Sequence, residues 1–154
     1  MRTTISWRHL LEQAIEQHAH LPQARFVQLA TIRRDGRPAN RTLAFRGWLE
    51  PEECLLFTTD LRSAKVRQLG AWTWAEACWY FTETREQFRL LGQISVETAA
   101  TGGARAAATR QSTSVGILVL LPTEVEYRDL RARPHLRRLY RRVQHAWTDV
   151  VVNP

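Results

Sequence analysis

The spacing of apolar residues changes near residue 21, and this change divides the chain into a helical start and a strand-rich remainder. Within residues 8–19 the apolar positions recur at intervals of one, three and four, as on one face of a helix. They are Leu10, Leu11, Ala14 and Ile15, with His18 in line. Ser6 is placed to cap the first turn, and Leu21-Pro22 ends the segment. The pattern predicts one amphipathic helix.

Short runs of β-branched and apolar residues follow the helix at close intervals. These runs cover residues 25–32, 40–48, 54–59, 74–81, 86–97 and 115–121. The Asp35-Gly36 pair between the first two runs is typical of a hairpin turn, and the polar residues 82–85 predict another turn. Residues 63–69 have helical character. Short strands with few helices predict a mainly β barrel or sandwich with flanking helices.

Two further segments are less regular. Residues 99–114 are rich in glycine, alanine, serine and threonine and have no apolar face, which predicts a flexible connection. Residues 134–145 fit a helix with Pro134 in its first turn, and they also fit a strand paired with residues 147–152. The local pattern slightly favours the helix.

The composition is that of an ordinary globular protein. Of 154 residues, 44% are hydrophobic and 24% are charged, which argues against a disordered chain, a collagen-like rod and a membrane protein. The length predicts a single domain over residues 1–154. No apolar run reaches the roughly 18 residues of a membrane span, and the N-terminus has no secretory signal pattern. We therefore expect a cytoplasmic protein without a membrane partner.

The charge is unusual in its make-up. The formal net charge is +7, and Lys65 is the single lysine among 22 basic residues. Composition bias explains most of such an arginine excess. The functional alternative is an anionic partner, either a nucleic acid or a small molecule with a phosphate group. Cys54, Cys78 and the five histidines have no metal-ligand spacing, so we expect no metal site.

Cationic and hydroxyl side chains on consecutive predicted strands are the remaining candidates for chemistry. The sequence contains no Rossmann glycine motif, P-loop, serine-hydrolase elbow or zinc-protease motif. Arg41 and Arg46 lie five positions apart on one predicted strand, so they face opposite sides unless a bulge intervenes. Residues 57–65 run from a strand into a helix start, where backbone amides, a hydroxyl and Lys65 can hold a phosphate.

The order of these residues resembles the FMN-binding split β-barrels related to pyridoxamine 5′-phosphate oxidase. The motifs that carry the resemblance are Arg41 to Gly47, Phe57-Thr58, Ser63 with Lys65, and Arg85-Glu86-Gln87. Residues 37–42, 79–89 and 152–154 agree with one subgroup of this family, so the resemblance extends over almost the whole chain. It implies a split β-barrel, bound FMN and a homodimer with FMN at its interface. It also implies that residues 136–142 and 147–152 are paired strands.

The resemblance assigns particular residues to parts of the cofactor. The implied phosphate contacts are Arg41 and Lys65, with help from Ser63 and Arg62. The implied contacts of the isoalloxazine ring are backbone atoms of Thr42, Leu43 and Ala44, together with Arg137 and, across the dimer interface, Gln87. Thr58 would meet the ribityl or phosphate end, and Phe57 and Arg46 complete the cofactor motifs.

Several positions depart from the oxidase itself. Residues 99–114 stand where the oxidase has a helical segment that contacts the substrate phosphate, and they contain no tyrosine. Arg46 replaces a lysine of the family motif, and Arg128 replaces an aromatic neighbour of the flavin. Arg133 and His135 match the first two residues of the oxidase's substrate-side Arg-x-His-x-Arg motif. Arg133, His135 and Arg46 are therefore the substrate-side candidates, and no catalytic residue is identified.

These features predict an FMN-dependent oxidoreductase that transfers a hydride between the flavin and a small organic substrate. One alternative is oxidation of pyridoxine or pyridoxamine 5′-phosphate in vitamin B6 salvage. A second alternative is a non-enzymatic module that binds nucleic acid through the arginines of residues 128–142. We expect a small-molecule substrate and a second copy of the chain as partners, rather than a nucleic acid.

Overall fold

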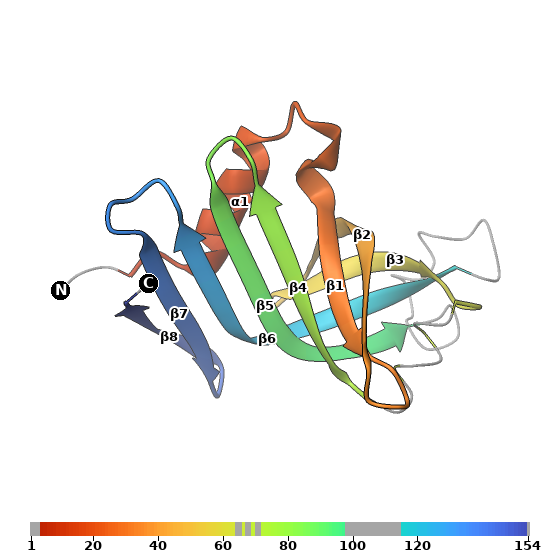
Figure 1. Ribbon diagram of the computed structural model, residues 1–154. Coiled ribbons are helices and arrows are strands. Elements are labelled where there is room, and N and C mark those ends of the chain that lie inside the picture. Colours follow the sequence, from red (N-terminus) through yellow and green to blue (C-terminus); the bar gives the residue numbers. More distant parts are fainter. Residues whose placement is uncertain (1–3, 64–65, 67–68, 70–71, 98–114, 154) are drawn as a thin grey trace.

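The computed structural model describes residues 4–63, 66, 69, 72–97 and 115–153, and these form one antiparallel sheet curled into a barrel (Figure 1). The helices are α1 (Trp7–Gln17) and the 3₁₀ helix η1 (Pro22–Arg25). The strands are β1 (Phe26–Ile32), β2 (Pro38–Leu49), β3 (Cys54–Asp60), β4 (Trp74–Phe81), β5 (Glu86–Glu97), β6 (Val115–Asp129), β7 (Leu136–Val143) and β8 (Ala146–Val152).

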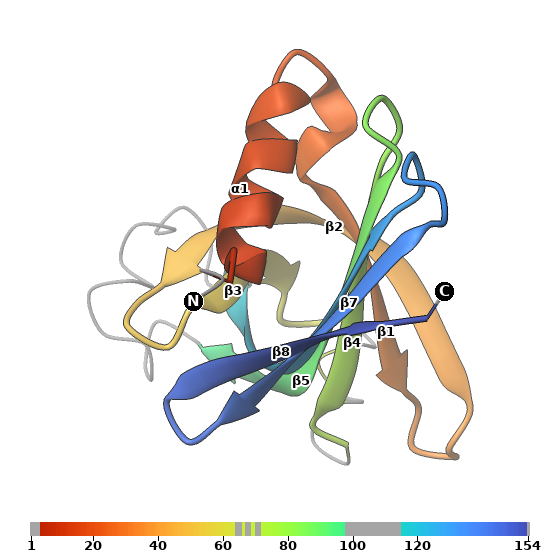
Figure 2. The ribbon, with the colours of Figure 1, turned by 90° about the vertical axis from the view of Figure 1, so that its left-hand side faces the viewer.

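The sheet has the strand order β3-β2-β1-β4-β5-β6-β7-β8, and an additional pairing of β3 with β6 closes the first six strands into a barrel. Strands β7 and β8 continue from one end of β6 beyond the closed part. Figure 2 shows this hairpin, in dark blue, running diagonally past the lower end of α1. The closed barrel and its extension confirm the mainly β fold expected from the short, closely spaced apolar runs.

Side chains alternate between an inner and an outer face along each strand, as the two-residue period requires. On β1, Val27 and Leu29 are fully buried, whereas Gln28 between them is exposed. The inner face and the apolar face of α1 form one core, to which α1 contributes Trp7, Leu11 and Ala14. Trp7 is fully buried, and its ring contacts those of Trp48 and Trp147. The helix therefore covers apolar surface of the barrel.

Most elements lie where the pattern predicts them. Ser6 caps α1 by accepting a hydrogen bond from the backbone N–H of His9 at 3.1 Å. The Asp-Gly turn joins β1 to β2, and Gly36 has a φ of +85°, which suits glycine. Strand β6 is longer than the predicted 115–121, because it continues through Pro122 to Asp129. A register shift at Leu91/Gly92 of β5 accommodates that proline.

The local preference for a helix over residues 134–145 is wrong, and the strand pair implied by the family resemblance is confirmed. Tertiary contacts outweigh the local pattern here. Tyr140 is 1% exposed on the inner face of β7, and its hydroxyl donates to the carbonyl of Ile5 at 2.9 Å. The predicted connection over 99–114 and most of the predicted helix after Ser63 lie outside the described residues, although Val66 and Leu69 are helical.

His18 fastens the end of α1 to the β4–β5 hairpin. Its Nδ1 lies 2.7 Å from the carbonyl oxygen of Ala14, and its Nε2 accepts a hydrogen bond from the backbone N–H of Glu83 at 3.1 Å. Because a carbonyl can only accept, Nδ1 carries the hydrogen and Nε2 keeps its lone pair. The ring is 2% exposed and packs on Phe81. One buried imidazole therefore satisfies groups on two elements.

We expect His18→Leu to lower the free energy of unfolding by about 1–3 kcal/mol, because leucine fills the space but leaves the Glu83 N–H without an acceptor. Urea denaturation measures the change. The matched control is His20→Leu, since His20 is exposed and pairs with the Glu83 carboxylate at 3.0 Å, so its loss should cost less than about 0.5 kcal/mol. Equal unfolding midpoints for the two variants would contradict this role.

Among the described residues, no helix combines the length and apolarity needed to cross a bilayer.

Candidate functional site

A bulge in β2 falls on the second of the two arginines of the first cofactor motif. Phe45 pairs with Phe57 of β3 and the next pair joins Gly47 to Leu56, so Arg46 is the extra residue. Arg46 lies on the outer face, where its Nε donates to the hydroxyl of Thr58 at 3.4 Å. Arg41 pairs with the fully buried Leu29 and lies on the inner face. The two arginines therefore face opposite sides of β2, as their spacing predicts.

Arg41 is a half-buried cation whose hydrogen bonds with the described residues all go to neutral groups. Its Nη1 donates to the carbonyl oxygen of Leu29 at 2.9 Å and to the hydroxyl of Thr31 at 2.7 Å. Burial lowers the pKa of Arg41 below the ordinary arginine value, and the positive charge of Arg33 lowers it further. No carboxylate among the described residues forms an ion pair with it. An anionic ligand would supply the missing charge.

The turn after β3 supplies a second feature that suits an anion. The hydroxyl of Ser63 is buried and has no hydrogen-bond partner in the described part of the chain. A buried polar group without a partner is costly, so such a group calls for a ligand or water. Arg62 is exposed and forms an ion pair with Asp60 at 2.9 Å, so a neighbouring carboxylate already compensates its positive charge. Lys65 lies outside the described residues, so its predicted phosphate contact stays a prediction.

The remaining residues of the first two motifs differ in whether they expose backbone or side-chain atoms to a ligand. Phe57 is fully buried in the core and Leu43 is half-buried on the inner face, so both offer chiefly backbone atoms. Thr42 is on the outer face, where its hydroxyl accepts from Gln28 at 3.3 Å. Ala44 shares that face. This placement suits the backbone role expected for residues 42–44.

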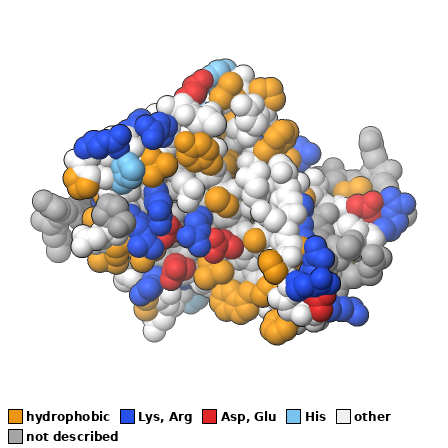
Figure 3. Space-filling view, in the orientation of Figure 1, with side chains coloured by type: hydrophobic (Ala, Val, Ile, Leu, Met, Phe, Trp, Pro, Cys, Tyr) orange, Lys and Arg blue, Asp and Glu red, His pale blue; other side chains and the backbone are white. Residues whose placement is uncertain are grey.

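A row of polar side chains crosses the outer face of β5, β6 and β7. In the strand register, Gln87 of β5 lies opposite Arg128 of β6, and Arg128 lies opposite Arg137 of β7. The three residues are therefore side by side on neighbouring strands. We call these three residues the outer row. The family resemblance implies flavin contacts for Gln87 and Arg137, and the fold brings these two residues together with Arg128 between them. In Figure 3 blue and red side chains interleave over this part of the molecule, and orange apolar side chains border them.

Glu126 lies beside the outer row and holds two of its members. It is 7% exposed, and its Oε2 accepts from Arg137 at 2.6 Å and 3.0 Å, while its Oε1 accepts from Arg128 at 2.6 Å. Burial alone would raise the pKa of Glu126, but the hydrogen bonds and charges of Arg137 and Arg128 outweigh it and hold the pKa below the ordinary value. Glu126 is therefore an ionised anchor for both guanidinium groups.

This depressed pKa predicts a specific loss of stability in acid. A carboxylate whose pKa is lower in the folded state contributes stability above the ordinary glutamate value of about 4.3, and this stability is lost as pH falls through the folded value. We expect the unfolding free energy of the wild type to fall more steeply below about pH 4.3 than that of Glu126→Gln. Urea melts at pH 3–7 measure both slopes. Parallel curves would show that Glu126 is not held by its arginines.

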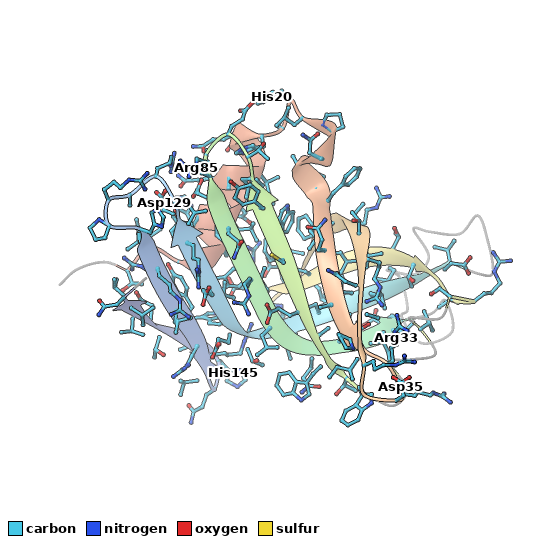
Figure 4. All side chains as sticks on the ribbon, in the orientation of Figure 1. His20, Arg33, Asp35, Arg85, Asp129 and His145 are labelled. Carbon is cyan, nitrogen blue, oxygen red and sulfur yellow. The ribbon has the colours of Figure 1, made fainter. Side chains whose placement is uncertain are left out.

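Arg133 and His135 lie together in the loop between β6 and β7. Arg133 Nη1 and His135 Nε2 are 2.7 Å apart, and both side chains are exposed. The loop begins after Asp129, the last residue of β6. Figure 4 labels Asp129 and Arg85 near each other at one end of the molecule. Two of the three substrate-side candidates of the sequence are thus brought together, at the same end as Gln87 and Arg128, whereas the third, Arg46, lies on β2 beside Thr58.

Many arginines of residues 128–142 have acidic partners. The carboxylates of Asp129, Glu126, Asp149 and Glu124 pair with Arg131, Arg137, Arg138 and Arg141, respectively. These ion pairs reduce the charge available to a polyanion, so the segment is not an uncompensated basic stripe.

The phosphate-side residues and the outer row lie at opposite ends of one molecule. Arg41 lies near Arg33, whose positive charge lowers the pKa of Arg41. Figure 4 labels Arg33 at the β1–β2 turn, away from Arg85 and Asp129. Five strand spacings separate β2 from β7, which is about 24 Å across the sheet. By the other route, Arg128 is 11 positions beyond Ile117, the residue opposite Thr58, which is about 36 Å measured along β6. The two sets therefore lie at different ends of the sheet within one copy.

Sequence reasoning missed Glu126. The signal was present, because Glu124, Glu126 and Arg128 alternate with Val125 and Tyr127 as outer and inner residues of a strand do. The predicted strand ended at residue 121, before Pro122, so this alternation was not recognised.

Comparison with known proteins identifies the family of this chain. A family model described as pyridoxamine 5′-phosphate oxidase, FMN-binding domain, matches residues 4–98. Pyridoxine/pyridoxamine 5′-phosphate oxidase 2 of Arabidopsis thaliana is 49% identical over 90 residues, which are 58% of this chain and 46% of that protein. The pyridoxine/pyridoxamine 5′-phosphate oxidase of Burkholderia multivorans is 34% identical over 81 residues, 53% of this chain and 37% of that protein. The chain thus matches less than half the length of these relatives.

Solved structures agree over the full length. An FMN-binding protein related to pyridoxamine 5′-phosphate oxidase, from Nostoc punctiforme, is 34% identical and superposes with a TM-score of 0.91 over 99% of both chains. PhzG from Burkholderia lata has a TM-score of 0.78 at 20% identity, over 99% of this chain and 95% of that one, which supports the fold alone. The chain therefore belongs to the family of pyridoxamine 5′-phosphate oxidase FMN-binding domains, whose fold is the split β-barrel and whose cofactor is FMN.

Proposed function

We propose that this chain binds FMN as a homodimer and transfers a hydride between FMN and a small organic substrate. The observation that carries the proposal is the half-buried Arg41, whose guanidinium contacts neutral groups and lacks a carboxylate partner among the described residues. The unpartnered buried hydroxyl of Ser63 supports it. A guanidinium and a hydroxyl are the donors that a phosphate monoester accepts from. When bound, FMN supplies the redox chemistry, and the protein supplies binding and orientation.

A homodimer explains why the expected cofactor residues lie in two distant sets. Arg41 and Ser63 would hold the phosphate within one copy, and Thr58, on the outer face of β3, would meet the ribityl chain. The outer row of a second copy would reach the ring side, because the two sets lie at different ends of the sheet within one molecule. A twofold arrangement creates two equal sites, each with the phosphate side of one chain and the outer row of the other.

The outer face has the surface that such a dimer needs. The apolar side chains of Phe26, Trp74, Tyr80 and Val150 are 43–52% exposed. Register places all four on the same face as Gln87. Aromatic and aliphatic side chains that border an ion-paired cluster are typical of protein–protein interfaces.

A comparison of FMN with riboflavin tests the phosphate site directly, since the two differ by the phosphate group alone. We expect the flavin-free protein to quench the fluorescence of added FMN and to bind FMN at least about 30-fold tighter than riboflavin. Sedimentation of the loaded protein should give a dimer. A protein that takes up no FMN, or that binds both flavins equally, would contradict the proposal. Bleaching of the bound flavin by reduced nicotinamides or by organic donors then identifies the reducing substrate.

Oxidation of pyridoxine or pyridoxamine 5′-phosphate is a second candidate, favoured by the close approach of Arg133 to His135 at the end of the sheet that carries the outer row. The relatives from Arabidopsis and Burkholderia carry that name. The test is formation of pyridoxal 5′-phosphate by the FMN-loaded protein, with unphosphorylated pyridoxamine as the control. Turnover that depends on Arg133 and His135 would support this activity. Absence of turnover at full flavin loading would leave the general oxidoreductase.

A further inference from the structure

Two arginines lie directly opposite each other on the outer face. Arg128 of β6 pairs with Arg137 of β7, and like charges at such positions destabilise an antiparallel sheet. Glu126 offsets this repulsion, because it lies on the same face two residues before Arg128 and accepts hydrogen bonds from both guanidinium groups. A local arrangement that opposes folding and needs a dedicated neighbour is typical of a functional site.

The carboxylate of Glu126 occupies one side of each guanidinium and leaves the other side open. Arg128 bonds to it through Nε, so both Nη nitrogens of Arg128 have no partner among the residues that the structure describes. Arg137 uses Nε and Nη2, so its Nη1 is open in the same sense. The two side chains are 37% and 30% exposed. Free N–H donors of two fixed guanidinium groups therefore point away from Glu126.

The cluster also carries a surplus of positive charge. Arg89 joins it by pairing with Glu76 at 2.5 Å, and its Nη1 lies 3.6 Å from Glu126 Oε1. Three guanidinium groups thus face two carboxylates, so the cluster has one positive charge that its own acids do not compensate. Planar guanidinium groups match the two oxygens of a carboxylate or phosphate group.

We propose that Glu126 holds Arg128 and Arg137 as a receptor for an anionic group of the substrate, a carboxylate or a phosphate, with Arg128 as the residue that selects it. The inference rests on the proposed function in one respect, because the dimer is what brings the outer row to the flavin of the other copy. Glu126 is a positioning residue in this receptor, since it acts through the two arginines. The reacting substrate would accordingly be a small organic anion.

Binding of benzoate, measured by calorimetry with the FMN-loaded and the flavin-free protein, tests the receptor, and benzamide is the neutral control of the same shape. Inorganic phosphate is titrated into the FMN-loaded protein as the second anion. We expect benzoate to bind at least 10-fold tighter than benzamide, and Arg128→Gln to weaken benzoate at least 10-fold. Arg141→Gln is the matched variant, since Arg141 is on the same face of β7 and pairs with Glu124, and it should bind benzoate as the wild type does.

Glu126→Gln separates positioning from simple charge. Loss of a negative charge would strengthen anion binding if charge alone mattered, whereas loss of the anchor should weaken benzoate several-fold and Glu126→Asp should restore part of the affinity. The inference is overturned if Arg128→Gln binds benzoate and phosphate like the wild type, if Glu126→Gln binds them more tightly, or if the wild type binds neither.

The same data distinguish this inference from the proposed function. If the wild type takes up no FMN but binds benzoate in a way that depends on Arg128, the proposed function fails and the receptor stands. If FMN is bound and Arg128→Gln loses FMN affinity while it keeps benzoate affinity, the guanidinium serves the cofactor and the inference is overturned.

Discussion

Arg41→Ala should weaken FMN binding by roughly 30-fold or more, about 2 kcal/mol, while riboflavin binding stays within a few-fold of the wild type. The reason is the environment of Arg41, which is half-buried and lacks a carboxylate partner in the described part of the chain. A phosphate would pair with a cation that has no competing anion, in a place where water screens little. Fluorescence titration of the flavin-free protein with each flavin measures the two affinities.

Two further variants control this result. Arg37→Ala removes an exposed arginine from the neighbouring turn, where it pairs with Asp35, so FMN affinity should be unchanged. Ser63→Ala should weaken FMN binding without lowering the stability of the flavin-free protein, because the lost hydroxyl is buried and has no partner among the described residues. Equal loss of FMN and riboflavin affinity in Arg41→Ala would point to a damaged barrel and contradict a phosphate contact.

The strands were predictable because their hydrophobic pattern and their burial have the same cause. Strand β5 has alternating inner and outer residues, and β4 and β5 have the predicted bounds 74–81 and 86–97. The Asp35-Gly36 turn fixed the first hairpin. The end of β6 was missed because Pro122 is a strand breaker in isolation, whereas here the register shifts between Leu91 and Gly92, so that Thr123 is an extra residue of β6 and the pairing continues on both sides.

The C-terminal strands were not predictable from local pattern. Residues 136–142 contain arginines and leucines that also suit a helix, and only the edge of β6 and the contact of Tyr140 with Ile5, 135 positions away, decide for a strand. The same holds for the candidate site. The motifs identified Arg41, Ser63, Gln87 and Arg137 one by one. Their division into two distant sets follows from the strand order, which no local pattern contains.

This division gives the strongest test of the dimer. If each site takes its phosphate side from one chain and its outer row from the other, a chain with Arg41→Ala and a chain with Arg137→Ala should complement each other. In a mixed dimer, one site combines both defects. The other combines the intact Arg41 of one chain with the intact outer row of its partner.

We therefore expect the mixed dimer, co-expressed with two affinity tags and purified through both, to bind FMN with wild-type affinity at one of its two sites. Each homodimeric variant should have no wild-type site. If both sets served a flavin within one chain, the mixed dimer would contain two different weak sites and no wild-type site. Gln87→Ala is a second outer-row variant, for use if Arg137→Ala does not fold. It leaves Glu126 paired with both arginines, so we expect the fold to stay intact. Recovery with Arg41→Ala and either outer-row variant, but not between the two outer-row variants, is the pattern that only a shared site produces.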